Sequence, residues 1–369
     1  MYTTIRPMTK RLLAALVLLV ALALTIGFAG CEWAPLLLGD RQTDTTTKNP
    51  DKLSPTLSED TNLTPEYLHP LTGLESTAED ACLRPVSICI GNTSNALPQF
   101  ALGSADMLVE VPIEGGFTRL MLLTTNYKNL EKAGSVRATR NYLARIAAGF
   151  DAVQFYAGTV DTGQSTTLPY DTMDYLTQIL THTYYPDQSR SAPHNLMTDG
   201  TRIAAGLSTQ GYRTTLDEQF TLPFVFSEYG KTRLPAERSA NALKITFSSV
   251  QEVEFAYQPS TKTYLRDQMG EAHLDGGDNQ QLAFTNLFIL YSDAITYEGA
   301  DGSTLELNLS NGGSGYYCYG GMAQQITWTM DENNHMSFYD AGGQLLTVNR
   351  GNSYIGFVKA IESHTVIMQ

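Results

Sequence analysis

The sequence predicts an α/β or α+β N-terminal domain followed by a smaller, mostly antiparallel all-β C-terminal domain. Three observations predict this division. Strand-like and helix-like apolar runs alternate over residues 69–230. A polar, proline-bearing stretch at 231–240 is typical of a linker. Over 241–369 the apolar runs are short and alternating and are separated by glycine-rich turns, which favours a sandwich or small barrel.

The N-terminus carries the pattern of a lipoprotein signal peptide over residues 1–30. Basic residues precede an apolar run, Leu12–Phe28, and the small residues Ala29 and Gly30 stand directly before Cys31. This order predicts cleavage before Cys31 and diacylation of its thiol by palmitate-like chains. Each buried methylene contributes ~0.8 kcal/mol, so two chains give a stable membrane anchor. An uncleaved transmembrane helix is the alternative, and both place the remaining chain on the extracytoplasmic face of the cell membrane.

Residues 31–68 are rich in Thr, Asp and Pro and offer little apolar surface to bury. We therefore expect a flexible tether between the anchor and the first domain, with an ordered arm as the alternative.

Charge and cysteine content narrow the class of protein. The whole chain has 24 Lys+Arg and 38 Asp+Glu, and residues 1–30 hold three of the basic residues, so the rest has 21 − 38 = −17. A charge of this sign argues against nucleic acid as a partner. With Cys31 lipidated, Cys82, Cys89 and Cys318 remain, which permits one disulfide, Cys82–Cys89, or free thiols. The histidines lack metal-ligand spacing, so we expect no metal and no cofactor.

Within the first domain the predicted elements follow from the period of the apolar residues. Pro85–Gly91 reads as a buried strand, and two further runs meet at Gly115-Gly116 as a hairpin. The two strands of this hairpin are Met107–Ile113 and Phe117–Thr124. The remaining predictions are a strand at Asp151–Ala157 and helices at Val136–Phe150, Tyr170–Leu180 and Thr198–Leu207.

Five basic or chargeable side chains in this domain are candidates for an anion-binding site. Each stands at the end of a predicted element or beside an apolar run: Arg119, Arg137, Arg140, Arg190 and His194. Arginine offers a planar fork of donors that fits carboxylate or phosphate oxygens. We expect Arg137 and Arg140 to share one face near the N-terminus of the predicted helix, where an anion would be favoured. The alternative is that internal carboxylates satisfy the arginines, and the candidates for these are Glu110, Glu114 and Asp151.

The chain resembles the YerB-like lipoproteins, a family of two consecutive domains of unknown function. The resemblance covers most of residues 69–358. It is carried by His69-Pro70-Leu71-Thr72-Gly73-Leu74, Arg84-Pro85-Val86, Ala105-Asp106, Glu114-Gly115-Gly116-x-Thr118-Arg119, Val136-Arg137-x-x-Arg140, Ser189-Arg190-x-Ala192-Pro193-His194-Asn195, Tyr264-x-Arg266, Asp275, Asn286, Gly313-x-Gly315 and Thr327-Trp328. It implies an extracytoplasmic lipoprotein of Gram-positive-type bacteria and brings no established activity.

The chain departs from the family pattern at several polar positions. The family usually has Asp at the position of Gly91, Arg at Leu97, His at Tyr156 and Gly at Thr159. If these polar residues formed a catalytic set, this chain would lack part of it, while a binding site would remain.

Two hypotheses of different class follow. The first, which we favour, is a non-catalytic binding or accessory lipoprotein that recognises an anionic envelope ligand or a wall-assembly protein. The second is an enzyme that acts on phosphorylated or polyprenyl-linked wall precursors, with Glu110 or Glu114 as base or metal ligand. A resemblance at Ala105-Asp106 and Arg137–Arg140 to the LytR-CpsA-Psr phosphotransferases suggests this second reading.

Overall fold

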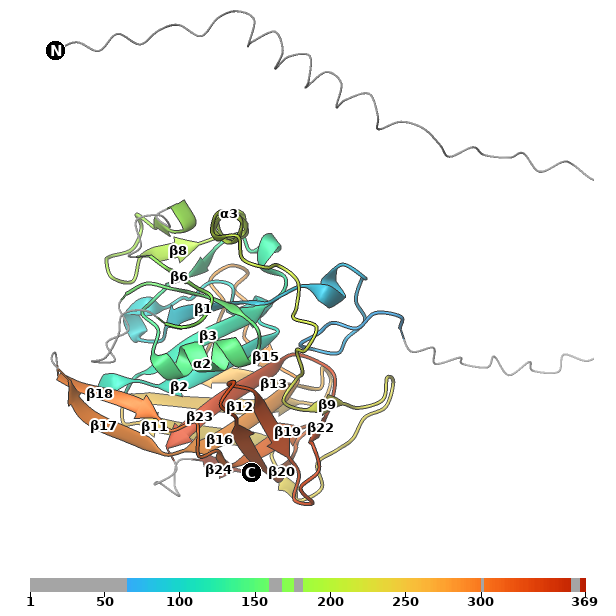
Figure 1. Cartoon of the computed structure of the whole chain (residues 1–369). Coiled ribbons are helices and arrows are strands. Elements are labelled where there is room, and N and C mark those ends of the chain that lie inside the picture. Colours follow the sequence, from blue (N-terminus) through green and yellow to red (C-terminus); the bar gives the residue numbers. More distant parts are fainter. Residues whose placement is uncertain (1–64, 159–167, 176–181, 300–301, 360–365) are drawn as a thin grey trace, which may run out of the picture. The chain divides into compact units, whose positions relative to one another are not determined.

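An eleven-stranded sheet runs through the structure, in the order β10-β20-β19-β16-β23-β2-β3-β1-β5-β6, with β21 paired to β20 (Figure 1). The structure is a computed structural model, and it describes residues 65–158, 168–175, 182–299, 302–359 and 366–369. The predicted signal peptide, Cys31 and nearly all of the predicted tether lie outside the described residues, as does Thr159.

The N-terminal half supplies short strands and the two α-helices found in the described residues. Its strands are β1 (Val86–Gly91), β2 (Met107–Pro112), β3 (Thr118–Thr124), β4 (Ala133–Gly134), β5 (Val153–Tyr156), β6 (Thr172–Asp174), β7 (Tyr185–Pro186), β8 (Leu196–Thr198) and β9 (Val225–Phe226). Its helices are α2 (Asn141–Gly149) and α3 (Gly200–Gln210), with single turns of 3-10 helix at Asp80–Cys82, Ser94–Ala96, Leu102–Ser104, Glu114–Gly116 and Tyr127–Asn129. The structure is therefore mostly β.

The C-terminal half is built from strands in the part of it that the structure describes. They are β10 (Arg238–Ser239), β11 (Ala242–Ser248), β12 (Gln251–Gln258), β13 (Thr263–Gln268), β14 (Glu271–Ala272), β15 (Ala283–Phe284), β16 (Asn286–Ser292), β17 (Ala294–Gly299), β18 (Gly302–Leu307), β19 (Gly313–Tyr319), β20 (Met322–Met330), β21 (Met336–Tyr339), β22 (Thr347–Val348), β23 (Ser353–Lys359) and β24 (Val366–Met368).

The two halves of the sequence share the large sheet. Strand β23 pairs in parallel with β2, from Met107 opposite Ser353 to Glu110 opposite Gly356, and its other edge pairs in parallel with β16. The sequence predicted that the C-terminal strands close into a sandwich or barrel of their own. The structure differs from this prediction. The C-terminal strands divide between the large sheet and a second sheet of order β14-β13-β12-β11-β24, with β15 paired to β13.

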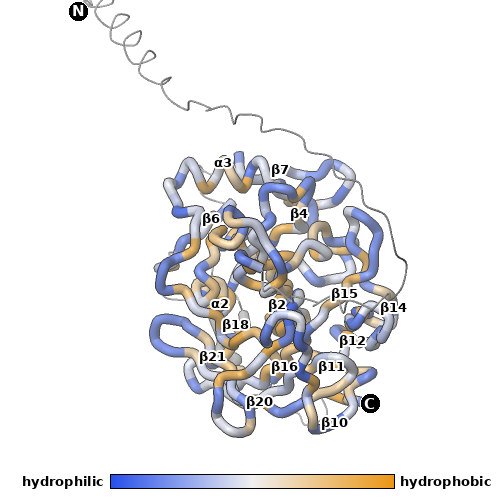
Figure 2. Tube along the Cα trace, turned by 90° about the vertical axis from the view of Figure 1, so that its right-hand side faces the viewer, coloured by the Kyte–Doolittle hydropathy of each residue, from blue (hydrophilic) through white to orange (hydrophobic). Residues whose placement is uncertain are grey.

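Two apolar cores lie on opposite faces of the large sheet. On one face, strand residues such as Leu108 and Leu122 pack against the second sheet through Phe255 and Tyr264. On the other face, Val109 and Met121 pack under α2, and the same core continues to β18. Figure 2 shows apolar segments along the interior strands and polar ones in the peripheral loops. Alternate residues of one strand thus enter different cores. This follows from the two-residue period of side chains along a strand in a sheet that is covered on both faces.

The hairpin and the flanking strands are confirmed. Strands β2 and β3 pair antiparallel from Met107 opposite Leu123 to Pro112 opposite Thr118, with positive φ at Gly115 and Gly116 in the turn between them. Helix α3 begins after Asp199, whose carboxylate accepts a hydrogen bond from the Arg202 backbone N–H, so the capping prediction there is also confirmed.

Two helix predictions need correction. The predicted helix at Tyr170–Leu180 is wrong at Thr172–Asp174, which form β6 beside β5, and 176–181 lie outside the described residues. The predicted helix at Val136–Phe150 begins only at Asn141, because the Val136 segment bridges to Ile90 and the backbone N–H of Arg137 bonds to the Cys89 carbonyl. Pairing to the edge of β1 therefore replaces the first turn of helix that the periodicity favoured.

The three described cysteines are free thiols. Cys89 and Cys318 are buried and Cys82 is exposed, so the Cys82–Cys89 disulfide is absent. Burial raises the pKa of the Cys89 thiol to about 11, which keeps it protonated at neutral pH. Within the described ranges, no helix combines the length and apolar content needed to cross a membrane.

Candidate functional site

Three arginines from separate segments meet beside the N-terminal end of α2. Arg119 lies on β3, Arg137 lies in the segment that pairs with β1, and Arg140 is the residue before the first turn of α2. The charge of Arg140 lowers the pKa of both Arg119 and Arg137, and the charge of Arg137 also lowers the pKa of Arg119, which places the three charges close together. We call Arg119, Arg137, Arg140 and the neighbouring His194 the arginine cluster. The sequence grouped these residues, but it placed Arg137 and Arg140 on a helix face, whereas both precede the helix.

Arg119 is the member of the cluster whose charge is least satisfied. Its side chain stands on the α2 side of the sheet and the residue is only 6% exposed. Its Nε atom is buried and has no hydrogen-bond partner among the described residues. Burial, together with the charges of Arg140 and Arg137, lowers its pKa to about 10, although the Cys89 thiol acts in the opposite direction. Arg119 therefore remains charged at neutral pH, and no carboxylate in the described part of the chain pairs with it.

Arg140, in contrast, has a carboxylate partner. Its Nε atom donates to both oxygens of Glu114 at 3.1 Å, and its Nη2 atom donates to Oε2 at 2.5 Å. Burial works against both charges, but the pair raises the pKa of Arg140 and lowers that of Glu114. In the structure, Glu114 is thus the ion-pair partner of Arg140.

The remaining members of the cluster are Arg137 and His194. Little in the described structure offsets the positive charge of Arg137. The Nη1 atom of Arg137 donates to the carbonyl oxygen of Pro193 at 2.9 Å, a neutral acceptor. His194 follows directly, and its Nδ1 atom is buried without a partner within the described part of the chain. Burial, followed by the charges of Arg137, Arg190 and Arg119, lowers the pKa of His194, so it is neutral at pH 7.

Arg190 lies close enough to lower the pKa of His194, but its own donors are used within the protein. They bond to carbonyl oxygens of the loop before β2, at Pro98 (2.9 Å), Ala96 (2.7 Å), Leu97 (3.1 Å) and Asn95 (3.5 Å). This arginine therefore holds the loop in place, and we remove it from the ligand-binding candidates.

Asp151 lies outside the arginine cluster, contrary to the sequence interpretation. It follows the C-terminal end of α2 and pairs with Arg84 at 3.3 Å and Arg213 at 2.7 Å. Because the cluster lies before the other end of the same helix, Asp151 does not contribute to its charge.

Glu110 points away from the arginine cluster, into the core between the two sheets. Both of its oxygens accept two hydrogen bonds. Oε1 accepts from Asn92 (3.0 Å) and Thr118 (2.6 Å), and Oε2 accepts from Arg266 (2.8 Å) and Tyr354 (2.8 Å). Glu110 is thus an ion-pair partner, but of Arg266 on β13. A carboxylate that accepts four bonds at zero exposure has no site left for a substrate proton or a metal ion.

The polar network around Glu110 continues to His273. Arg266 Nη1 bonds to His273 Nδ1 and, at 3.0 Å, to the amide oxygen of Gln268. His273 Nε2 bonds at 2.8 Å to the amide oxygen of Gln99. Because that oxygen only accepts, Nε2 carries the proton and Nδ1 accepts from Arg266. Residues from both halves of the sequence are therefore linked by one buried hydrogen-bond network.

Sequence reasoning missed Arg266 and His273 as buried groups. Arg266 stands in an alternating strand, and its buried neighbours two residues away on either side are Tyr264 and Gln268. That alternation, with the Tyr264-x-Arg266 motif, is the signal that could have placed an arginine on the core face.

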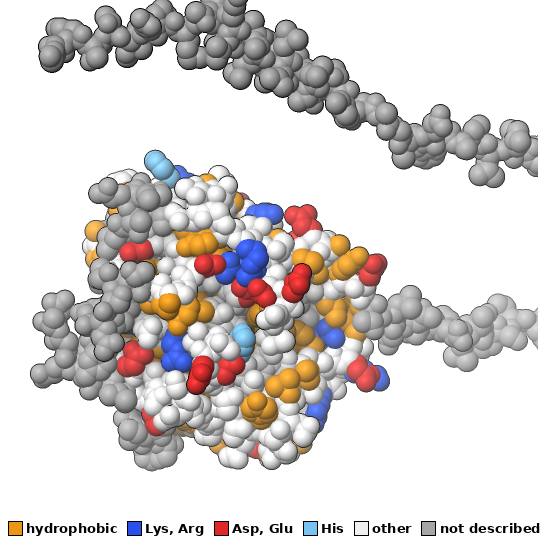
Figure 3. Space-filling model, in the orientation of Figure 1, with side chains coloured by type: hydrophobic (Ala, Val, Ile, Leu, Met, Phe, Trp, Pro, Cys, Tyr) orange, Lys and Arg blue, Asp and Glu red, His pale blue; other side chains and the backbone are white. Residues whose placement is uncertain are grey.

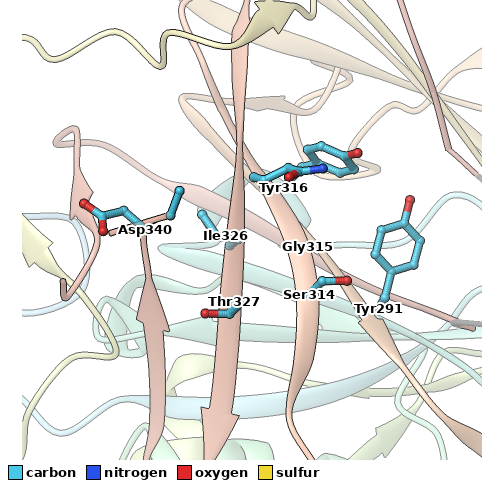
Figure 4. A pocket seen from close by; sticks show the side chains of 9 residues that line it. Tyr291, Ser314, Gly315, Tyr316, Ile326, Thr327 and Asp340 are labelled. Atoms are coloured by element: carbon cyan, nitrogen blue, oxygen red, sulfur yellow. The ribbon is translucent and has the colours of Figure 1, made fainter. Parts of the chain in front are cut away.

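Other features of the surface are less specific. On the face that carries α2, acidic and basic side chains alternate and no large patch of one sign is visible (Figure 3). A hollow of about 200 Å³ lies over β16, β19 and β20, lined by Tyr291, Tyr316, Thr327 and others (Figure 4). Ile326 is buried in this hollow, and the other side chains that line it are partly or fully exposed. Among the residues that the structure describes, no three His, Cys, Asp or Glu side chains are grouped to hold a metal ion.

The fold and the buried network define a class of protein in which two consecutive sequence domains share one sheet. Family models agree with this organisation. Residues 71–213 match the N-terminal domain and residues 243–355 the C-terminal domain of the family described as protein of unknown function DUF3048. The chain belongs to this family, and the resemblance to the YerB-like proteins is confirmed.

A curated relative and a solved structure agree with the family assignment. The chain is 24% identical over 302 residues to "Putative lipoprotein YerB" of Bacillus subtilis (strain 168). The aligned region covers 80% of this chain and 88% of that protein. The crystal structure of the Bacillus subtilis YerB protein matches with a TM-score of 0.70 and 22% identity, over 82% of this chain and 100% of that one. The structural match supports the shared fold. The domain limits drawn from the sequence remain a prediction.

Proposed function

We propose that this protein is a membrane-anchored extracytoplasmic lipoprotein that binds an anionic envelope ligand through Arg119, Arg137 and Arg140, without chemical turnover. The observation that carries the proposal is Arg119, a buried guanidinium group whose Nε atom has no partner in the described residues. Buried polar groups are normally hydrogen-bonded, and leaving one unpaired costs about 1–3 kcal/mol or more when it is charged. A bound anion supplies the missing acceptor.

The anchor in this proposal rests on the sequence around Cys31 and on the lipoprotein name of the relative. Mass spectrometry of the N-terminal peptide of the purified protein tests it. The peptide is expected to begin at Cys31 and to carry the mass of a diacylglyceryl group. A peptide that still contains residues of the apolar run Leu12–Phe28 would contradict cleavage and favour an uncleaved membrane helix.

The alternative of an enzyme finds less support at the residues it named. Glu110 accepts four hydrogen bonds, and the low pKa of Glu114 makes it a weak base at neutral pH. Glu114 also accepts a hydrogen bond from the backbone of Leu305 at 3.1 Å, in addition to its pair with Arg140. The arrangement therefore favours binding over proton transfer.

Thermal unfolding of the full chain in detergent micelles, with a panel of anions at constant ionic strength, tests the binding site. An anion at 100 times its Kd adds about 2.7 kcal/mol to the stability of the native state. We expect at least one multivalent anion to raise the melting temperature of the wild type, and Arg119→Gln and Arg137→Gln to abolish that increase.

Arg238→Gln is the matched control, because Arg238 lies over the ring of Tyr316 at 5.1 Å, away from the cluster. It should leave the response intact. If Arg119→Gln and Arg137→Gln instead melt far below the wild type without any anion, the two arginines are structural and the proposal fails.

A further inference from the structure

The position opposite Arg119 in the sheet is a glycine. Gly91 pairs with Arg119 in the register of β1 and β3. A Cβ atom at Gly91 would lie 3.0 Å from Cγ of Arg137 and 3.7 Å from Nη1 of Arg119. The missing side chain therefore lets the stem of Arg137 lie directly on the strand, and it brings two guanidinium groups to the same place.

The charges in the cluster do not cancel. Among the described residues, three guanidinium groups of the cluster lie beside one paired carboxylate, that of Glu114, so 3 − 1 = 2 positive charges remain within this set. The nearby carboxylate of Glu306 bonds to the side chain of Asn141 and interacts with Arg145 and Glu114. It thus belongs with Arg145, an arginine outside the cluster. An anion with two negative charges would balance the excess.

Donors approach the cluster from three different segments. Arg119 comes from β3 and Arg137 from the segment before α2, and beside them lies His194, whose Nδ1 atom has no partner in the described residues and donates in one of the two neutral tautomers. Helix α2 has nine residues, and its N-cap Arg140 makes no side-chain bond to the first turn. The first N–H groups of an α-helix favour anions. Donors from several directions suit a tetrahedral group with three free oxygens better than a planar carboxylate.

We propose that the anion is a phosphoryl dianion, such as a phosphate monoester, seated between Arg119, Arg137 and the first turn of α2. This inference rests on the proposed function and names the chemical class of its ligand. The guanidinium forks of Arg119 and Arg137 contact the terminal phosphoryl oxygens, and the ester oxygen is directed away from them. The glycine at position 91 is the specificity-determining residue, because a carboxylate side chain there would reach both arginines and neutralise the charge that holds the anion.

The first experiment compares anions of different charge and shape at pH 8, where phosphate is mainly dianionic. Melting temperatures of the full chain are measured with inorganic phosphate, malonate and dimethyl phosphate. Malonate has the same charge but planar groups, and dimethyl phosphate has the shape but a single charge. We expect phosphate to bind at least tenfold more tightly than either. A sugar phosphate and vesicles containing phosphatidic acid then compete with phosphate, and the stronger competitor identifies a soluble or a lipid source.

The second experiment uses an isosteric pair of variants. Gly91→Asp places a carboxylate within reach of both arginines, whereas Gly91→Asn adds the same bulk without charge. We expect Gly91→Asp to melt higher than Gly91→Asn without ligand and to lose the response to phosphate. Gly91→Asn should keep a measurable response.

The outcomes separate the two proposals. Tighter binding of malonate than of phosphate overturns the phosphoryl class and leaves the proposed function standing. Binding of none of the anions overturns both. A full phosphate response in Gly91→Asp, at the wild-type affinity, shows that the anion binds elsewhere and also overturns the inference.

Discussion

Two buried arginines of this protein have opposite environments. Arg266 is fully buried and bonds to Glu110, Gln268 and His273, whereas Arg119 is nearly as buried and its Nε atom has no partner in the described structure. Within the described ranges both Nε atoms are unpaired, but Arg266 forms an ion pair with a carboxylate and Arg119 does not. A buried ion is tolerated when it is paired, and this difference is the reason that Arg119, and not Arg266, is the centre of the proposed anion site.

At the same scale, His273 predicts how stability depends on pH. Burial and the charge of Arg266 hold its pKa well below 6.5 in the native state, so the native protein keeps it neutral. Below pH 6.5 the unfolded chain takes up a proton that the native state does not, and stability falls by up to about 1.4 kcal/mol per pH unit.

Urea unfolding of wild type and His273→Gln at pH 7.5, 6.0 and 5.0 measures this effect. The variant should be less stable at pH 7.5, because the network is broken, but its stability should fall less steeply toward pH 5.0. Equal slopes would show that His273 is protonated in the native state as well.

Strand β2 connects the two apolar cores of the molecule. Val109 and Val111 enter the core under α2, and Glu110 between them enters the core shared with the second sheet. The four groups that donate hydrogen bonds to Glu110 come from β3, β13, β23 and the residue after β1. A strand that is buried on both faces has a nearly continuous apolar sequence. The role of a carboxylate in such a strand becomes clear only when its hydrogen-bond partners are known.

Removing the charge of Glu110 is predicted to destabilise the protein strongly. Glu110→Gln leaves Arg266 without a carboxylate, and the new amide N–H₂ group meets donors where the oxygen accepted. Breaking a buried pair on one side costs about 3–5 kcal/mol. The free energy of unfolding in urea checks this.

Glu252→Gln serves as the control, because Glu252 pairs with Lys244 on the partly exposed face of the second sheet. Its unfolding midpoint should change little. A loss in Glu110→Gln as small as in the control would mean that water enters the network and replaces the bonds.

The whole described molecule shares one sheet across the boundary between its two family domains. Strand β23 of the C-terminal half lies between β2 and β16, and the described residues all fall within one compact unit, 61–369. Separating the halves would expose the edges of both strands and the buried ion pair between Glu110 and Arg266. Neither half then retains a complete core.

We therefore predict that the two halves unfold together. In hydrogen exchange followed by mass spectrometry across a urea series, peptides of β1 and β3 should lose protection at the same urea concentration as peptides of β16 and β19. Loss of protection in one half at clearly lower urea would show two independent domains.

The local elements could be predicted where the period of the residues agreed with the final contacts. The β2–β3 hairpin followed from alternation around Gly115-Gly116, and α3 followed from its cap at Asp199. Prediction failed where a distant partner changed the local preference. The Val136 segment pairs with β1 instead of forming helix, and Thr172–Asp174 extend the sheet beside β5.

The sequence by itself determined the types of residue at the candidate site, the change in composition near 231–240 and the pattern around Cys31 that predicts a lipoprotein signal, because these are local patterns. Only the tertiary structure decided which carboxylate meets which arginine. Glu110 and Arg266 are 156 residues apart and meet because the two sheets pack face to face, whereas Arg119 lies opposite Gly91 in the register and has no carboxylate partner among the described residues. Charges act through space, so their balance is fixed by the fold and not by their order along the chain.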